Sequence, residues 1–244
     1  MYKNLPNICY ECGSTLDKES LTKEHVPPKS FFPKSDRDSL ITVPACVKHN
    51  GGKSDDDEYF FQIICMQIQA NEKGQDIATN KAVRGVLRNR KITKGLASNA
   101  TQVYIDEDRT GQLKPTFAFK FDDEKLDNSI SSICKALYYY EFHKVFIGDI
   151  KTYYEFQISL DEDSIKQNQE FEKIRHLINK NFSNIEKKGK NQDVFYYQVM
   201  EIPKGLEFSL AIRLCFYGGV GIVALLKKEP KFKFNAFMSA LIKM

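Results

Sequence analysis

Two pairs of metal-ligating residues near the N-terminus constrain the fold of this chain more than any other feature. The first pair is Cys9 and Cys12, and the second is Cys46 and His49. Both spacings allow the two side chains of a pair to turn onto one ion, and four such ligands make a closed tetrahedral zinc site. The sequence therefore predicts a structural zinc ion held by these residues. The alternative is three ordinary thiols and a surface histidine.

The segment that contains the two pairs needs support from such an ion. Residues 1–54 are rich in Cys, Pro, Lys and turn-forming residues and contain only short apolar runs. A segment of this composition buries too little apolar surface to be stable alone, whereas the binding free energy of zinc can order it. We therefore expect zinc to act as a staple for this part of the chain.

The remaining cysteines favour a reducing compartment. Cys65, Cys134 and Cys215 each stand alone in an apolar run, which is typical of buried free thiols rather than of a disulfide framework. The N-terminus shows no signal-peptide pattern, and metal-spaced cysteines in such a chain are typical of cytosolic proteins. We expect a cytoplasmic protein.

The most apolar stretch of the chain runs from Leu206 to Leu226 and has to be tested as a membrane span. It contains the charged residues Glu207 and Arg213 and a central pair of glycines. These features favour a β-hairpin over a span. We therefore expect no membrane contact.

Hydrophobic periodicity predicts an α+β fold. Helices are expected from Ser54 onward and within residues 128–146 and 162–182. Strand-like alternation occurs at residues 101–107, 116–121, 152–160, 194–202 and 207–226, the last interrupted by a turn. This pattern predicts a mostly antiparallel sheet with helices packed on one side.

The length and composition fit a compact domain with a smaller module. The chain has 244 residues, 42% of them hydrophobic, which is enough to bury a core. We expect an N-terminal module over residues 1–70, a helical basic connector over 71–100 and an α+β domain over 101–244. The net charge of +4 permits a polyanionic partner without indicating one. The basic residues of the connector form either a solvated helix face or a phosphate-contacting surface: Arg84, Arg88, Arg90, Lys91 and Lys94.

A second group of residues lies between and just after the two zinc pairs. Glu24 and His25 are adjacent and precede two prolines, while Asn50 directly follows the second pair and Lys53 comes three positions later. In this combination, residues 8–60 resemble the zinc-stapled form of the HNH endonucleases. The resemblance implies a ββα-metal fold, in which a two-stranded ribbon carries the histidine and a helix carries the final asparagine.

The resemblance also implies a role for each residue of this group. His25 would be the general base that takes a proton from the attacking water. Glu24 and Asn50 would hold a catalytic Mg²⁺ or Mn²⁺ ion, and Lys53 would contact a phosphate. Chemistry supports this division, since a hard cation takes oxygen ligands and the pKa of imidazole lies close to neutral pH. For Lys53, and for Lys29, the alternative is a plain surface lysine.

Two departures from the HNH pattern stand out. The middle asparagine of the motif is missing from the stretch before Cys46, so Thr42 or a backbone carbonyl would have to orient the His25 ring. Glu24 also stands where the family often has Asp, which lengthens the metal ligand by one methylene.

The other polar candidates have simpler explanations. Asp56 and Asp57 either serve the positive end of a helix or add an oxygen ligand to the catalytic ion. His143 and His176 fall within helical patterns and are expected to be surface or partly buried residues rather than ligands.

These expectations combine into a functional hypothesis. The chain is expected to be a metal-dependent endonuclease that hydrolyses phosphodiester bonds in nucleic acid, with double-stranded DNA as the partner, and to serve as a restriction or phage-defence effector. Two alternatives remain open. One is a zinc-stapled nucleic-acid-binding module without catalysis, and the other is a nuclease subunit that is active only within a larger complex or after an activator reaches the C-terminal domain. Besides nucleic acid, the partner expected is another protein or a second copy of the chain in a homodimer.

Overall fold

The computed structural model describes residues 5–52, 54–77, 98–105, 111–161 and 163–228. Its N-terminal part contains β1 (Thr22–Val26), the short 3₁₀ turns η1 (Lys29–Phe31) and η2 (Lys34–Asp36), β2 (Ile41–Ala45), α1 (Val47–Gly51), α2 (Ser54–Cys65) and α3 (Glu72–Ile77). The remainder contains β3 (Ala100–Ile105), β4 (Lys114–Phe119), α6 (Asp123–Phe142), β5 (Gly148–Tyr154), α7 (Ser164–Phe182), β6 (Phe195–Glu201), β7 (Leu210–Phe216) and β8 (Val220–Lys228). The protein is thus a mixed α and β fold, as predicted.

All strand pairs in the described residues are antiparallel. β1 pairs with β2 and β3 with β4, while the main sheet has the order β5-β8-β7-β6. The apolar stretch tested as a membrane span is the β7–β8 hairpin, in which Phe216 pairs with Val220. Among the described residues, no helix is long and apolar enough to cross a membrane.

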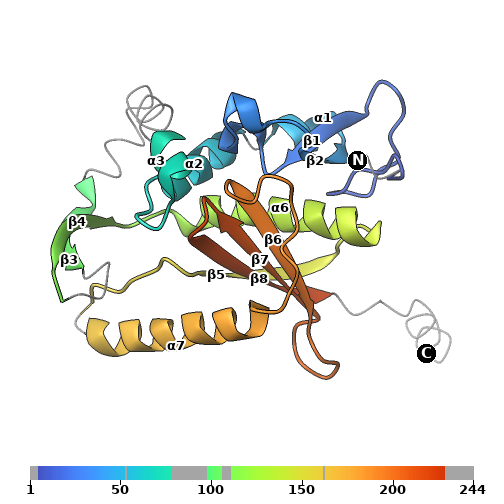
Figure 1. Ribbon diagram of the computed structural model, residues 1–244. Helices are drawn as coiled ribbons and strands as arrows, with labels where there is room; N and C mark the ends of the chain where they lie inside the picture. The colour runs from blue at the N-terminus through green and yellow to red at the C-terminus, as the bar shows by residue number, and fades with distance from the viewer. Residues whose placement is uncertain (1–4, 53, 78–97, 106–110, 162, 229–244) are drawn as a thin grey trace.

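Helices cover both faces of the main sheet, so the expectation that they pack on one side is wrong. Neighbouring residues of a strand point to opposite faces. In β6, the Tyr197 hydroxyl donates to Glu141 of α6 at 2.6 Å, whereas the Gln198 amide donates to the carbonyl of Phe182, the last residue of α7, at 2.8 Å. Figure 1 shows α6 and α7 on opposite sides of the sheet. Periodicity along one helix cannot reveal which sheet face that helix covers.

Two sequence expectations on the C-terminal half need comment. The strand expected over residues 152–160 ends at Tyr154, because the chain turns there and the Gln157 amide donates to the Tyr154 carbonyl at 3.1 Å. The basic connector falls mainly on residues 78–97, which lie outside the described residues together with its five cations. The domain boundaries at 70 and 100 therefore stay predictions.

The N-terminal segment packs into the same hydrophobic core as α6 and the main sheet. The ring of Phe31 lies 5.5 Å from that of Phe60 in α2 and 5.2 Å from that of Phe216 in β7. The buried Tyr10 hydroxyl lies 2.7 Å from the Ser132 hydroxyl of α6. Packing therefore supports this segment in addition to any bound ion.

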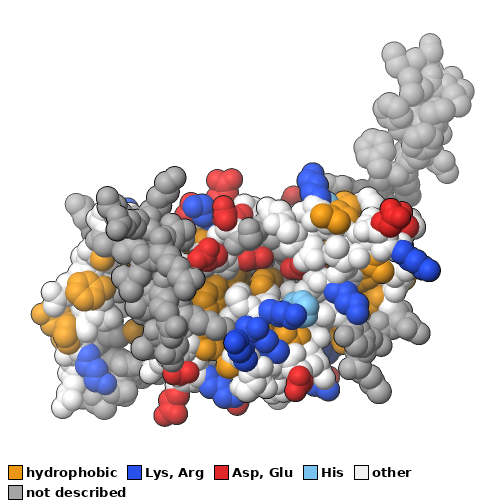
Figure 2. All heavy atoms as spheres, turned by 90° about the horizontal axis from the view of Figure 1, so that it is seen from above, with side chains coloured by type: hydrophobic (Ala, Val, Ile, Leu, Met, Phe, Trp, Pro, Cys, Tyr) orange, Lys and Arg blue, Asp and Glu red, His pale blue; other side chains and the backbone are white. Residues whose placement is uncertain are grey.

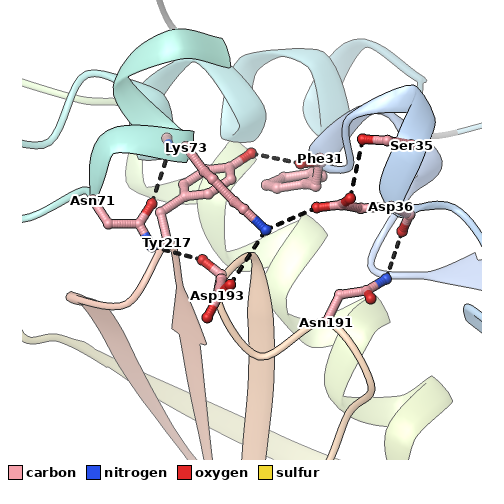
Figure 3. A network of polar contacts seen from close by, with 9 residues as sticks. Phe31, Ser35, Asp36, Asn71, Lys73, Asn191, Asp193 and Tyr217 are labelled. Carbon is pink, nitrogen blue, oxygen red and sulfur yellow. Dashed lines mark hydrogen bonds and ion pairs between the residues drawn. The ribbon is translucent and has the colours of Figure 1, made fainter.

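A polar clamp fixes the same segment to the main sheet. Figure 3 shows Lys73 of α3 between Asp36 and Asp193, at 3.1 and 3.2 Å. These ion pairs are largely exposed and contribute little to stability. Beside them, the buried Tyr217 hydroxyl donates to the Phe31 carbonyl at 2.8 Å, and the Asn71 amide N–H donates to the Tyr217 carbonyl at 2.8 Å.

Tyr217→Phe tests the buried part of this junction. The substitution leaves the Phe31 carbonyl without its hydroxyl donor, and removing one partner of a buried hydrogen bond costs about 1–3 kcal/mol. We expect the free energy of unfolding to fall by that amount, measured by urea denaturation. Lys73→Met, which breaks only exposed ion pairs, should change it by less than about 1 kcal/mol.

Candidate metal centre

The four predicted zinc ligands come together. One ligand atom from each of Cys9, Cys12, Cys46 and His49 lies within 4.8 Å of all the others. Nδ1 of His49 is 3.1 Å from Sγ of Cys46 and 3.6 Å from Sγ of Cys9. Tetrahedral zinc, with bonds of about 2.3 Å to sulfur and about 2.0 Å to nitrogen, separates its ligands by about 3.5–3.8 Å. The group thus fits a metal ion such as zinc.

Local backbone structure places each pair. The Cys9–Cys12 pair lies in a turn in which the Gly13 amide donates to the Cys9 carbonyl at 2.9 Å, and Gly13 has φ +74°, a conformation that favours glycine. Cys46 precedes the first residue of α1, and the His49 amide donates to the Cys46 carbonyl at 3.0 Å. One helical turn therefore brings both side chains of the second pair together.

The two cysteines of the first pair have different environments. Cys9 is buried, which raises the pKa of its thiol. Cys12 is exposed, and its Sγ lies 3.2 Å from the Ser14 hydroxyl, a hydrogen bond that lowers the pKa of Cys12 to about 6. Since the thiolate is the form that binds zinc, an exposed thiolate beside a buried sulfur suits one ion at the protein surface.

Contacts with α6 hold the first pair in place. Glu11, between the two cysteines, forms an ion pair with Lys135 of α6 at 2.6 Å, and both side chains are less than one quarter exposed. The Tyr139 hydroxyl of α6 also donates to the Pro6 carbonyl at 2.8 Å. The candidate metal centre therefore rests on a long helix that belongs to the main core.

The hairpin of β1 and β2 carries the candidate base. His25 lies directly opposite Thr42 in the register, so both point to the same face. Glu24, its neighbour in the strand, lies on the other face and is only 5% exposed. Thr42, one of the two groups expected to replace the missing asparagine of the motif, is therefore on the side of the hairpin where His25 lies.

Basic side chains surround His25. Partial burial is the main factor that lowers the pKa of its imidazole, and the charges of Lys29, Arg37 and Lys23 lower it further. Figure 2 shows Lys and Arg side chains gathered beside a histidine on the face that carries the N-terminal hairpin. Burial and these charges therefore favour the neutral form of the His25 imidazole.

The sequence singled out Lys29 of these three cations but not the other two. Lys23 could have been found from the strand period, since it lies two residues before His25 in β1 and therefore points to the same face. Arg37 follows η2 in an irregular loop, where it donates to the Phe32 carbonyl at 3.3 Å. No sequence pattern indicates that this loop folds back toward β1.

The other candidates are placed as follows. Asn50 is a half-buried residue of α1, one position after the ligand His49, and Lys53 lies outside the described residues. Asp56 accepts from Asn128 at 3.1 Å and Asp57 from Ser129 at 3.0 Å, so both tie α2 to α6. Neither carboxylate needs a metal ion to explain its position.

The remaining cysteines and histidines agree with their simpler explanations. Cys65, Cys134 and Cys215 are buried free thiols. His143 caps the C-terminal end of α6 with φ 54°, and His176 is on α7; both are exposed.

Comparisons with protein-family models, with curated proteins and with solved structures find no match for this chain. The resemblance to HNH endonucleases therefore depends on the sequence motifs alone.

Proposed function

We propose that the protein is a metal-dependent endonuclease that hydrolyses phosphodiester bonds in DNA. The observation that supports this most is the position of His25: a half-buried imidazole that faces Thr42 across the hairpin, has three cations around it, and lies on the strand pair that leads into the metal centre. A phosphodiester is an anion, so positive side chains beside a base favour its approach.

The proposed roles follow from the chemistry of each side chain. His25 takes the proton of the attacking water, and Thr42 orients the imidazole ring. Lys23, Lys29 and Arg37 attract and position the phosphate backbone. Glu24 and Asn50 would hold a divalent ion such as Mg²⁺ or Mn²⁺, which neutralises charge on the phosphate when it is bound. The Cys9, Cys12, Cys46 and His49 centre has a structural role.

A plasmid-nicking assay tests the proposal. The full chain, loaded with zinc, is incubated with supercoiled DNA and a series of Mg²⁺, Mn²⁺ and Ca²⁺. We expect conversion to open-circular and linear forms with Mg²⁺ or Mn²⁺ and none with a chelator of hard cations. Absence of nicking under all of these conditions, by protein that binds DNA, would contradict an endonuclease.

The decrease of the cleavage rate at acid pH should report the pKa of His25. Because its pKa lies below the ordinary value of 6.5, the imidazole is already neutral at pH 7. The cleavage rate should therefore stay constant above about pH 7 and fall as the pH drops through the lowered pKa. Lys29→Gln removes one of the charges that lower this pKa, so the decrease should move to higher pH. Initial rates from pH 5 to 8, with zinc content checked at each pH, measure this shift.

A second candidate function is a zinc-stapled nucleic-acid-binding module without catalysis. The observation that favours it is Glu24, which is 5% exposed and on the opposite face of β1 from His25. A carboxylate in that position could serve the core of the module rather than an ion. Salt-dependent DNA binding without nicking would support this candidate, whereas loss of nicking in Glu24→Gln with zinc content unchanged would support the endonuclease.

A further inference from the structure

A large cavity lies on the side of the main sheet that faces α7, on the opposite face from α6. Its volume is about 790 Å³, and residues of β6, β7, α7 and the loop between α2 and α3 line it. Those that matter for the argument are Phe156, Asn179, Lys187, Tyr196, Arg213 and Gly219. A cavity of this size is within the range that accommodates small organic ligands. Neither the metal centre nor His25 is part of it.

The floor of the cavity carries a guanidinium with spare donor capacity. Nε and Nη2 of Arg213 each donate to the Glu155 carboxylate at 2.7 Å, and Nη2 also donates to Asn179 at 2.8 Å. The side chains of Arg213 and Glu155 are only 14% and 10% exposed. Within the described part of the chain, Nη1 of Arg213 has no hydrogen-bond partner. This end of the fork can therefore donate to an additional acceptor.

A second cation at the cavity has no acidic partner. The ammonium of Lys187 lies 4.7 Å from the centre of the Tyr196 ring, and among the described residues no carboxylate pairs with it. The other charges at the cavity cancel, because Arg213 pairs with Glu155 and Arg175 pairs with Glu172 at 2.7 Å. The cavity therefore carries one uncompensated positive charge.

Part of the cavity wall is apolar, and polar side chains such as Asn179 form the rest. The ring of Phe156 is buried in it, and Ile158 and Ile68 are 46% and 40% exposed at its edge. Large aliphatic side chains exposed beside a cation can pack against an organic ligand that carries one anionic group. A free inorganic ion would leave this apolar surface in contact with water.

We propose that this cavity binds a small organic anion, with its carboxylate or phosphate on Arg213 and Lys187 and its apolar body against Phe156 and the two isoleucines. The inference does not depend on the proposed nuclease activity.

Binding should also stabilise the junction between the two halves of the chain. Gln69 and Gly219 line the cavity, and a Cβ at Gly219 would lie 2.2 Å from the Gln69 carbonyl, so the two segments approach closely there. Asn71, two residues after Gln69, belongs to the polar clamp of Figure 3. A ligand that bridges these segments stabilises the folded chain by mass action and raises its melting temperature.

Calorimetric titration of the full chain with simple probes tests the proposal. The probes are phenyl phosphate, benzoate, inorganic phosphate and phenol, so that the anion and the apolar body are varied separately. We expect phenyl phosphate or benzoate to bind at least about tenfold more tightly than phenol and inorganic phosphate, with weaker binding at high salt. The tighter of the two identifies the anionic group. Equal affinity for phenol, or no binding of any probe, would overturn the proposal.

Matched variants assign the binding to the cavity. Lys187→Gln should weaken binding about tenfold, because a charge-assisted contact is lost. Lys190→Gln, an exposed residue of the same loop outside the cavity, should have no effect. Arg213→Lys keeps a charge beside Glu155 but removes the guanidinium fork, and it should also weaken binding. Unchanged affinity in both cavity variants, in chains that fold normally, would contradict the assignment.

Discussion

Cys9→Ser or His49→Ala should release zinc and strongly destabilise the N-terminal part of the chain. We expect about one zinc ion per wild-type chain and less than a tenth of that in either variant. Because binding of a structural metal is coupled to folding, its loss should lower the free energy of unfolding by more than about 4 kcal/mol. Metal analysis after gel filtration and thermal melts measure the two effects.

The hydrophobic core that the N-terminal segment shares with the main sheet limits how far the loss of zinc destabilises the chain. Phe31, Phe60 and Phe216 pack together, and Tyr10 contacts α6, so the segment remains attached to the main sheet when the ion is gone. Hydrogen exchange should therefore increase most around the two ligand pairs and least in β7 and β8.

Cys65→Ala is the matched control for the loss of a sulfur atom. Cys65 is buried in α2 outside the ligand cluster, and its Sγ lies 3.8 Å from the Tyr217 hydroxyl. This variant should keep its zinc while losing about 1 kcal/mol of stability. Wild-type protein that folds without zinc, or Cys9→Ser with unchanged zinc content, would show that the four residues are not a structural metal site.

The ligand cluster and the β7–β8 hairpin could be predicted from sequence because both depend on local spacing. In each metal-binding pair, two residues separate the ligands, so both ligands lie within a single turn of the chain. The turn that ends at Gly13 holds the first pair, and the first turn of α1 holds the second. Strand alternation around Gly218 and Gly219 likewise fixes the hairpin, in which Gly218 has φ +75°.

Features that depend on contacts between distant residues could not be predicted. Lys73 meets Asp36 and Asp193 only after η2, α3 and the loop before β6 have packed together. The carboxylates at the start of α2 were expected to serve the helix end or an ion, yet Asp56 and Asp57 bind side chains of α6. No periodicity in one segment encodes such a partner.

In the candidate site, too, local features could be predicted from the sequence and contacts between distant residues could not. The adjacent Glu24 and His25 are visible in the sequence, but their distribution over the two faces of β1 appears only once β1 pairs with β2. That pairing also decides that Thr42, rather than another residue of β2, lies opposite His25.

His25→Ala should remove DNA cleavage while leaving the fold and the zinc content unchanged. The imidazole is half-buried on the hairpin, and the zinc ligands are contributed by other residues, so the substitution deletes the base alone. Loss of a general base lowers a rate by about 10²–10⁴-fold, and we expect a decrease in this range for plasmid nicking. Initial rates with Mg²⁺ and Mn²⁺, normalised to zinc content, provide the measurement.

His176→Ala is the control for the loss of a histidine, because His176 is exposed on α7 and far from the hairpin in the fold. It should nick DNA at the wild-type rate. DNA affinity should be unchanged in His25→Ala, since the phosphate backbone is held by Lys23, Lys29 and Arg37, and each of these cations contributes to the salt dependence of binding. If His25→Ala cleaves as fast as wild type, another group takes the proton and the proposed base is wrong. If it loses affinity and cleavage together, His25 contributes to DNA binding, and the loss of cleavage follows from lost binding rather than from a lost base.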